Sequence, residues 1–373
     1  MKIETRVVHA GGTPDPSTGA IAPPIHLSTT FEHGPATEDL HGYLYVRDKN
    51  PTQDRLEEAM AALEDGEDAL VFASGMGATI AALQALEAGS HVIFPEDVYV
   101  HARVAHREFL PKWGIEASAV DARDLAAVRR ALRPNTKLIW METPSNPRME
   151  ITDIAAVSAI AHEAGALALV DNTFASPVLQ RPFEHGADLV LHSTTKYCGG
   201  HSDTQGGCLV LKTRGALYDK LFHLRMILGA VCSPFNSWLV LRGLRSLACR
   251  MQRHSENGLA VARALAEMEQ VETVFYPGLP THRGHGIAAR QMSAFGGMLS
   301  ILVKGGWDEA VGFASRVKLF QNATSLGGVE SLIEHRASAE GPGSTSPPNL
   351  LRLSVGLEHA DDLIADLRQA AER

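Results

Sequence analysis

Short apolar segments that alternate with helical patterns constrain the fold of this chain most strongly. Strand-like runs cover residues 69–73, 91–94, 138–142, 166–170, 188–192 and 208–211, and amphipathic spacing predicts helices over 53–63, 79–86 and 154–163. Such strands, apolar on both faces and separated by helices, are typical of a mostly parallel sheet that helices cover on both sides. The sequence therefore predicts an α/β domain whose ligands bind beyond the carboxyl ends of the strands.

The pattern changes after about residue 247. Helices are predicted over 260–269, 307–316 and 361–371, with strands over 296–303 and 350–355. This second set indicates a smaller C-terminal α/β domain. We therefore expect three parts, which are an N-terminal arm (1–48), a large domain (49–247) and a C-terminal domain (248–373).

The first 48 residues show no regular pattern, because glycines and prolines such as Gly11-Gly12 and Pro23-Pro24 interrupt it. The segment nevertheless carries Phe31, Tyr43 and Tyr45, which is more apolar surface than a free tail would hold. We interpret it as an extended arm that packs against another surface, and in an oligomer that surface could belong to another subunit.

Composition excludes several classes of protein. The 373 residues are 45% hydrophobic and 21% charged with a net charge of −9, which is typical of a soluble globular protein. The sequence contains no block of Lys or Arg, so we expect neither nucleic acid nor an anionic membrane as a partner. No apolar run reaches the roughly 20 residues that span a bilayer, and the N-terminus lacks a signal-peptide pattern. We expect a cytoplasmic protein.

Cysteine and histidine usage predicts neither disulfides nor a metal site. The four cysteines form no C-x-x-C pair, which indicates reduced thiols. The 17 histidines show no zinc-ligand spacing with companion cysteines, so we expect no metal.

The strongest chemical signal is Lys196, which follows the strand 188–192 and is flanked by hydroxyl residues. Asp171 ends the preceding strand, 166–170, and Thr173 follows it. Pyridoxal phosphate (PLP) needs an amine for a Schiff base, a carboxylate beside its ring nitrogen and small donors for its phosphate. Each residue has an ordinary alternative, because Lys196 could lie at the surface and Asp171 could cap a turn.

A phosphate site is predicted at the turn Ser74-Gly75-Met76-Gly77, which follows a strand and begins a helix. Free N–H groups at a helix N-terminus bind phosphate well. Ser193 and Thr195 would add hydroxyl donors. The alternative is an ordinary helix cap.

Aromatic and basic residues elsewhere could complete such a site. Arg47 offers a planar fork to a phosphate and Tyr45 a phenol, or both simply pack the arm. Tyr99 could stack on a flat ring or lie in a core. Arg352 interrupts the apolar strand 350–355 and needs a carboxylate partner, which is either a protein acid or a substrate carboxylate.

Together these segments resemble one family, the trans-sulfuration (Cys/Met metabolism) PLP-dependent enzymes. That family includes cystathionine γ-synthase, the cystathionine lyases, methionine γ-lyase and the O-acylhomoserine sulfhydrylases. The matching segments are Tyr45-Val46-Arg47-Asp48-Lys49-Asn50-Pro51-Thr52, Ala73-Ser74-Gly75-Met76, Glu142-Thr143-Pro144-Ser145-Asn146-Pro147, Asp171-Asn172-Thr173-Phe174, Ser193-Thr194-Thr195-Lys196-Tyr197, Ser325-Leu326-Gly327-Gly328 and Arg352-Leu353-Ser354-Val355-Gly356.

The resemblance implies a fold-type I enzyme with a mostly parallel seven-stranded sheet in the large domain. It also implies a homotetramer, a dimer of dimers whose active sites are shared between subunits. Catalysis would fall to Lys196 and Tyr99. The implied cofactor-binding residues are Tyr45, Arg47, Ser74, Gly75, Met76, Tyr99, Asn146, Asp171, Thr173, Ser193, Thr195 and Lys196. The implied substrate-binding residues are Asn146, Ser325, Leu326 and Arg352.

The implied activity is γ-elimination or γ-replacement on a small sulfur-containing or O-acylated homoserine-type amino acid. Methionine γ-lyase and O-acylhomoserine sulfhydrylase activities remain alternatives, followed by a β-lyase, an aminotransferase or a non-enzymatic relative. Lyases that act on cystathionine tend to have acids where this chain has Leu44 and Thr324, which counts against a substrate with a distal ammonium.

The chain also departs from the family pattern at other positions. Val100 and His101 replace the usual Gly-Gly or Gly-Cys, and Arg336 stands where proline is common. The loop 341–348 is shorter than usual. His101 could be an acid or base of the pocket, or a bulky wall.

Overall fold

The large domain is built on the predicted seven-stranded sheet, in the order β1-β7-β6-β5-β4-β2-β3. Its strands are β1 (Asp68–Phe72), β2 (His91–Pro95), β3 (Glu116–Val120), β4 (Thr136–Glu142), β5 (Leu167–Asp171), β6 (Leu189–His192) and β7 (Gly207–Leu211). Neighbours from β6 to β3 are parallel, and β7 is antiparallel to β6 and β1. The computed structural model describes residues 1–372, and the prediction of a mostly parallel sheet is confirmed.

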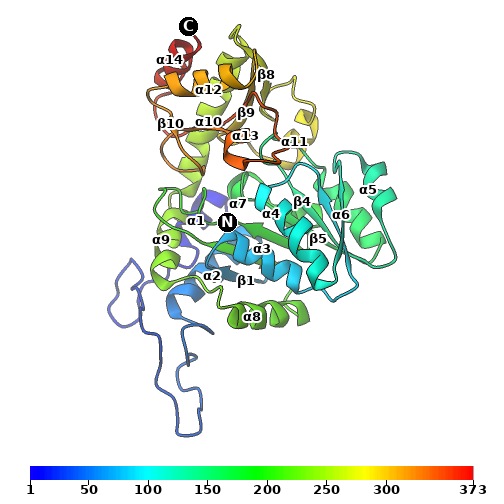
Figure 1. Cartoon of the computed structure of the whole chain (residues 1–373). Coiled ribbons are helices and arrows are strands. Elements are labelled where there is room, and N and C mark those ends of the chain that lie inside the picture. The colour runs from blue at the N-terminus through cyan, green and yellow to red at the C-terminus, as the bar shows by residue number, and fades with distance from the viewer. Residues whose placement is uncertain (373) are drawn as a thin grey trace.

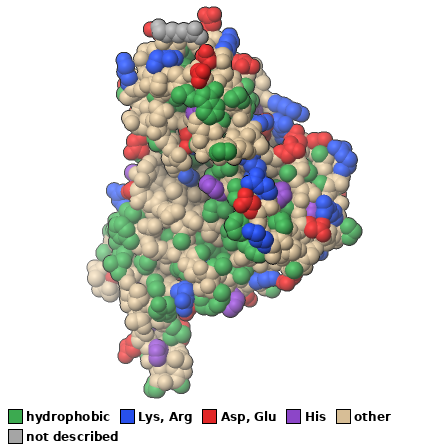
Figure 2. Space-filling view, viewed as in Figure 1, with side chains coloured by type: hydrophobic (Ala, Val, Ile, Leu, Met, Phe, Trp, Pro, Cys, Tyr) green, Lys and Arg blue, Asp and Glu red, His purple; other side chains and the backbone are tan. Residues whose placement is uncertain are grey.

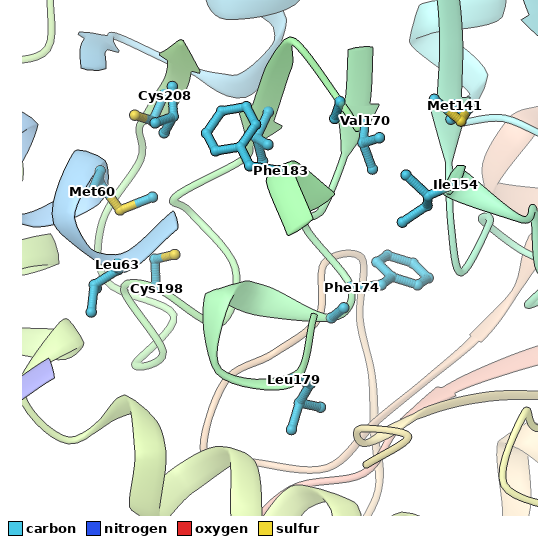
Figure 3. Packing of buried hydrophobic residues seen from close by; sticks show 14 of the residues in the cluster. Met60, Leu63, Met141, Ile154, Val170, Phe174, Leu179, Phe183, Cys198 and Cys208 are labelled. Atoms are coloured by element: carbon cyan, nitrogen blue, oxygen red, sulfur yellow. The ribbon is translucent and has the colours of Figure 1, made fainter. Parts of the chain in front are cut away.

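Helices cover both faces of this sheet (Figure 1). They are α2 (Pro51–Glu64), α3 (Gly75–Gln84), α4 (Val100–Val104), α5 (Leu125–Ala131), α6 (Ile154–Glu163), α7 (Ser176–Leu179), α8 (Ala216–Leu228) and α9 (Pro234–Leu244), with a π-helical turn at Ala105–Phe109 and 3-10 turns at Leu110–Trp113 and Pro182–His185. Successive strand residues point to opposite faces, so Val170 of β5 joins the core beneath α2 and α6 whereas Leu169 joins the core beneath α3 and α8. Figure 3 shows Val170 in the first of these cores, near Ile154 of α6 and Phe174.

The C-terminal domain has a second sheet of five strands in the order β10-β11-β12-β9-β8. The strands are β8 (Val271–Phe275), β9 (Met298–Val303), β10 (Gln321–Asn322), β11 (Leu332–His335) and β12 (Leu350–Ser354), and the helices are α10 (Leu247–Ala266), α11 (His285–Gln291), α12 (Trp307–Arg316), α13 (Arg336–Glu340) and α14 (Ala360–Ala371). The helix predicted over 260–269 is only the second half of α10. Its first half was missed because buried polar residues, among them Arg250 and His254, interrupt the apolar pattern.

The N-terminal segment is partly regular, contrary to expectation. Residues Ile3–His9 form α1, because the glycines and prolines begin only at Gly11 and leave Val7 free to pack at 2% exposure. Arg6 fixes α1 to the large domain by donating to the carbonyl of Ala62 (3.0 Å) and to Asp65 (2.5 Å). The following residues, up to about 48, project from the body as a narrow arm (Figures 1 and 2).

Within residues 1–372, no helix has the length and apolar character needed to cross a membrane.

Candidate active site

A cavity of about 260 Å³ lies at the carboxyl ends of β4, β5 and β6, where loops of the C-terminal domain meet the large domain. Its lining consists of Ser74, Gly75, Met76, Thr79, Tyr99, Glu142, Asn146, Asp171, Thr173, Phe174, Leu191, Ser193, Thr195, Lys196, Gln205, Thr324, Ser325, Leu326, Arg336 and Arg352. The structure thus brings together every predicted site residue except Tyr45 and Arg47. The position agrees with the expectation that ligands bind at strand carboxyl ends.

Lys196 lies in the turn after β6, and its Nζ donates to the hydroxyl of Ser325 at 2.6 Å. Burial lowers the pKa of Lys196 from its usual value to about 8, and the positive charges of Arg352 and Arg336 act in the same direction. Neutral amine is therefore present near physiological pH. That is the form able to attack a carbonyl carbon.

Asp171 is the last residue of β5, and its Oδ1 accepts the backbone N–H of Thr173 at 3.0 Å. Burial raises the pKa of this carboxyl, while the hydrogen bonds from Thr173 oppose the shift. The hydroxyl of Thr173 in turn accepts the N–H of Ser193 at 2.9 Å, which ties the ends of β5 and β6 together. A buried carboxylate at this place fits a cationic partner such as the protonated ring nitrogen of the predicted cofactor.

The start of α3 forms a cradle for an anion. The side chain of Ser74 caps the helix by accepting the N–H of Gly77 at 3.0 Å. A Cβ on Gly75 would come within 2.9 Å of the Ser193 Cβ, so only glycine allows this close approach between α3 and the turn after β6. The first N–H groups of a helix have no intrahelical acceptor, and the cradle therefore fits a phosphate. Thr195 beside it exchanges hydrogen bonds with the backbone of Gly206, both at 3.1 Å.

Arg352 lies in the middle of β12 at 4% exposure, opposite Glu334 of β11. The carboxylate partner that its position requires is Glu334, whose Oε2 lies 2.6 Å from Nη2. Nη1 donates to the side-chain oxygen of Asn146 at 3.0 Å and Nη2 to the carbonyl of Ser325 at 3.1 Å. Arg352 thereby links three segments that are distant in sequence.

Arg336 shares Glu334 with Arg352, and it also pairs with Glu340 at 3.1 Å. Arg103 also pairs with Glu340, so three guanidinium groups share the two carboxylates Glu334 and Glu340. The excess positive charge beside Arg352 favours the binding of a substrate carboxylate.

Glu142 was not predicted as a site residue. It ends β4 at 5% exposure and accepts the backbone N–H groups of Tyr99 (3.0 Å) and Asn146 (2.7 Å). Burial, reinforced by the nearby charge of Asp171, raises its pKa well above the usual range. An acid that ends an otherwise apolar strand was the signal in the sequence.

Tyr45 and Arg47 lie outside this cavity, on the projecting arm. The Arg47 guanidinium lies 5.2 Å from the centre of the Tyr45 ring, and Tyr45 is 43% exposed. Within one chain the pair contributes nothing to the cavity lining.

No group of three or more His, Cys, Asp or Glu side chains in the described part of the chain is arranged to hold a metal ion.

Comparison with known proteins adds an independent line of support. The family model for the Cys/Met metabolism PLP-dependent enzymes matches residues 4–372. A cystathionine gamma-synthase of Mycobacterium tuberculosis (strain ATCC 25618 / H37Rv) is 48% identical over 372 residues, which cover 98% of this chain and 96% of that protein.

Two crystal structures have the same fold over their full length. That of metB from Corynebacterium glutamicum has a TM-score of 0.97 at 43% identity, with 100% of this chain and 98% of that chain covered. That of a cystathionine gamma-lyase from Lactobacillus plantarum complexed with L-serine has a TM-score of 0.94 at 39% identity, with 99% and 98% covered.

Proposed function

The chain belongs to the Cys/Met metabolism PLP-dependent enzymes, and from that premise we propose that it catalyses γ-replacement or γ-elimination on an O-acylated or sulfur-containing homoserine-type amino acid. Among the candidate substrates, those without a distal ammonium, such as a homoserine ester, methionine or homocysteine, fit the cavity best. The observation that carries this choice is Thr324, a neutral residue of the lining at a position where an acid would be needed to pair with a distal ammonium. A homoserine ester has no such ammonium.

In the proposed arrangement, the residues of the cavity divide between cofactor and substrate. Lys196 would hold the carbonyl carbon of pyridoxal phosphate, Asp171 its ring nitrogen, and the start of α3 with Ser193 and Thr195 its phosphate. When bound, the cofactor supplies an electron sink for the charge that develops at the substrate's α-carbon. Arg352 and Asn146 would bind the α-carboxylate, which orients the α-hydrogen toward Lys196.

Proton transfer in this scheme is carried by two side chains. The Nζ of Lys196, whose pKa is lowered to about 8, would remove the proton from the substrate's α-carbon. The same group would then deliver a proton to a neighbouring carbon of the substrate. The phenol of Tyr99 would exchange a proton with the reacting substrate from the opposite wall. Burial keeps the pKa of Tyr99 above its ordinary value, so the phenol starts protonated.

A substrate panel tests the proposed reaction. O-acetyl- and O-succinylhomoserine are supplied with cysteine or sulfide, and methionine, homocysteine and cystathionine are supplied alone. We expect thioether or thiol products from the esters at a higher kcat/KM than 2-oxobutanoate and ammonia from cystathionine. Pyruvate as the main product would indicate a β-lyase, and a stoichiometric exchange of amino and oxo acids an aminotransferase. A yellow protein without turnover would contradict any enzymatic role.

We further propose that the active enzyme is a dimer of dimers in the cytoplasm, with the arm of one subunit completing the site of its neighbour. The support is that Tyr45 and Arg47 lie away from their own cavity while Ile21 and Leu27 of the arm are 66% and 68% exposed. The cysteines are free thiols, as a reducing compartment favours.

Complementation between two defective variants tests the shared site. Arg47→Ala should lower the affinity for pyridoxal phosphate, and Lys196→Ala should be inactive. A mixed dimer of the two should regain activity, because one of its sites combines an intact arm with an intact lysine. As a matched control, Lys196→Ala mixed with Asp171→Asn should stay inactive, since both residues belong to the same subunit's cavity. Equal results for the two mixtures would refute the shared site.

A further inference from the structure

His101 lies beside the cavity and has no role in the scheme above. It lies in α4, two residues after Tyr99, and its Nδ1 is 2.8 Å from the phenolic oxygen of Tyr99. The two rings meet edge to face, with centres 5.2 Å apart and planes at 63°. His101 is exposed whereas Tyr99 lines the cavity, so this pair connects the reacting centre to water.

The surroundings hold Tyr99 in place for this contact. Its backbone N–H is bound by Glu142, and its ring lines the cavity beside the guanidinium groups of Arg336 and Arg352. Burial raises the pKa of Tyr99, with Glu142 and Glu334 adding to the rise and the two arginines opposing it. The phenol therefore keeps its proton unless a base accepts it, and the imidazole is within hydrogen-bonding distance.

The charged residue of α4, Arg103, is already paired with an acid of the C-terminal domain. Arg103 of α4 forms an ion pair with Glu340 of α13 at 3.3 Å and donates to Thr345, whose carbonyl also accepts from Arg148 at 3.0 Å. These contacts join α4 to the C-terminal domain, and α13 lies directly above α4 in Figure 1. They hold the helix that carries His101 but leave its ring available to Tyr99.

We propose that His101 is a positioning residue that exchanges the proton of Tyr99 with solvent during the reaction. The Tyr99 O–H bond breaks as a bond to His101 Nδ1 forms, which leaves a phenolate and an imidazolium. The imidazolium releases its Nε2 proton to water, and the phenolate then accepts the proton that leaves the substrate. The reverse sequence returns a proton to the departing group. The inference rests on the proposed function, since it requires a substrate that loses and gains protons at this wall.

The kinetic test compares His101→Asn, which can hydrogen-bond but cannot relay a proton, with His101→Ala and the matched surface control His223→Asn on α8. With the substrate that wild type turns over best, both His101 variants should lose about tenfold in kcat with little change in KM, as expected for a lost proton-transfer partner. Added imidazole should restore His101→Ala but leave Tyr99→Phe unchanged. His223→Asn should behave as wild type.

Two kinetic outcomes would overturn the relay. The first is a wild-type kcat in His101→Asn, which would make His101 a wall of the pocket. The second is a slow His101→Ala that imidazole does not rescue. A wild type that turns over no member of the substrate panel would instead overturn the proposed function.

A readout independent of turnover uses cofactor-free protein labelled with ¹⁵N in the histidine rings. The signal of His101 is identified by its loss in His101→Asn. We expect the tautomer with the proton on Nε2 in wild type, because Nδ1 accepts from the phenol, and loss of this preference in Tyr99→Phe. An unchanged His101 signal in Tyr99→Phe would show that the contact does not exist in solution.

Discussion

Replacing Lys196 by alanine should abolish covalent attachment of pyridoxal phosphate and lower kcat by about 10⁴-fold or more, because the nucleophile and the acid–base group are lost together. The measurement is turnover of the best panel substrate, with peptide mass analysis after borohydride reduction to locate the attached cofactor. In wild type the cofactor should be found on Lys196. The exposed Lys137 provides the matched control, and Lys137→Ala should load and react as wild type. Attachment at any other lysine would contradict the assignment.

The pH dependence of loading follows from the burial of the same lysine. Its pKa is lowered to about 8, so the neutral amine is the minor form below that pH and the major form above it. The rate at which wild-type cofactor-free protein takes up pyridoxal phosphate should therefore rise with pH, with a midpoint near 8 rather than near the usual 10.5 of a lysine. A midpoint near the usual value would mean that Lys196 is solvated in solution.

The strand-end residues of the site were predictable because parallel strands bring their carboxyl ends to one edge. Ser74 follows β1, Asp171 ends β5 and Lys196 follows β6, and the alternation of strands and helices alone places all three at that edge. β1 is parallel to β6 although an antiparallel strand separates them, so its end reaches the same edge. The same local patterns missed β3, whose residues are mostly exposed or half-buried, and the helices α5, α8 and α9.

Contacts across the two domains were not predictable from local patterns. The hydrogen bond between Lys196 and Ser325 joins residues 129 positions apart, and that between Arg352 and Asn146 joins residues 206 positions apart. Hydrophobic periodicity and helix or strand propensity describe neighbouring residues only, and they carry no information on contacts between residues so far apart in the sequence. The need of Arg352 for a partner was visible, but the choice of Glu334 depended on the register of β11 against β12.

Buried polar side chains account for two further differences. Residues such as Arg250 and His254 hid half of α10, and the acid Glu142 was counted only as the end of a strand. These residues bind backbone groups, as Arg250 does with the carbonyl of Tyr197 at 2.7 Å. A binary apolar pattern treats each of them as exposed, because it cannot represent a polar group that is satisfied inside the protein.

Two substitutions in the charge cluster around Glu334 should affect different properties, one the stability of the protein and the other substrate binding. Glu334 is the carboxylate that Arg352 and Arg336 share, and all three side chains are buried. Removing the negative charge of Glu334 leaves the buried Arg352 without a carboxylate partner, whereas removing Arg352 leaves Glu334 still paired with Arg336. We therefore expect the first change to lower mainly the stability of the protein and the second to lower mainly kcat/KM.

Glu334→Gln should destabilise the protein by about 3 kcal/mol, which is typical when one partner of a buried ion pair is removed. Arg352→Met should cost less stability but lower kcat/KM by about 100-fold or more, because the substrate carboxylate loses its charged partner. Urea unfolding midpoints and steady-state kinetics of the holoenzyme measure the two effects. Glu163→Gln removes an acid from the exposed pair with Arg129 and should change neither quantity measurably. If Arg352→Met bound and turned over substrate normally, the α-carboxylate would have to be held elsewhere, and Arg336 would be the next residue to replace.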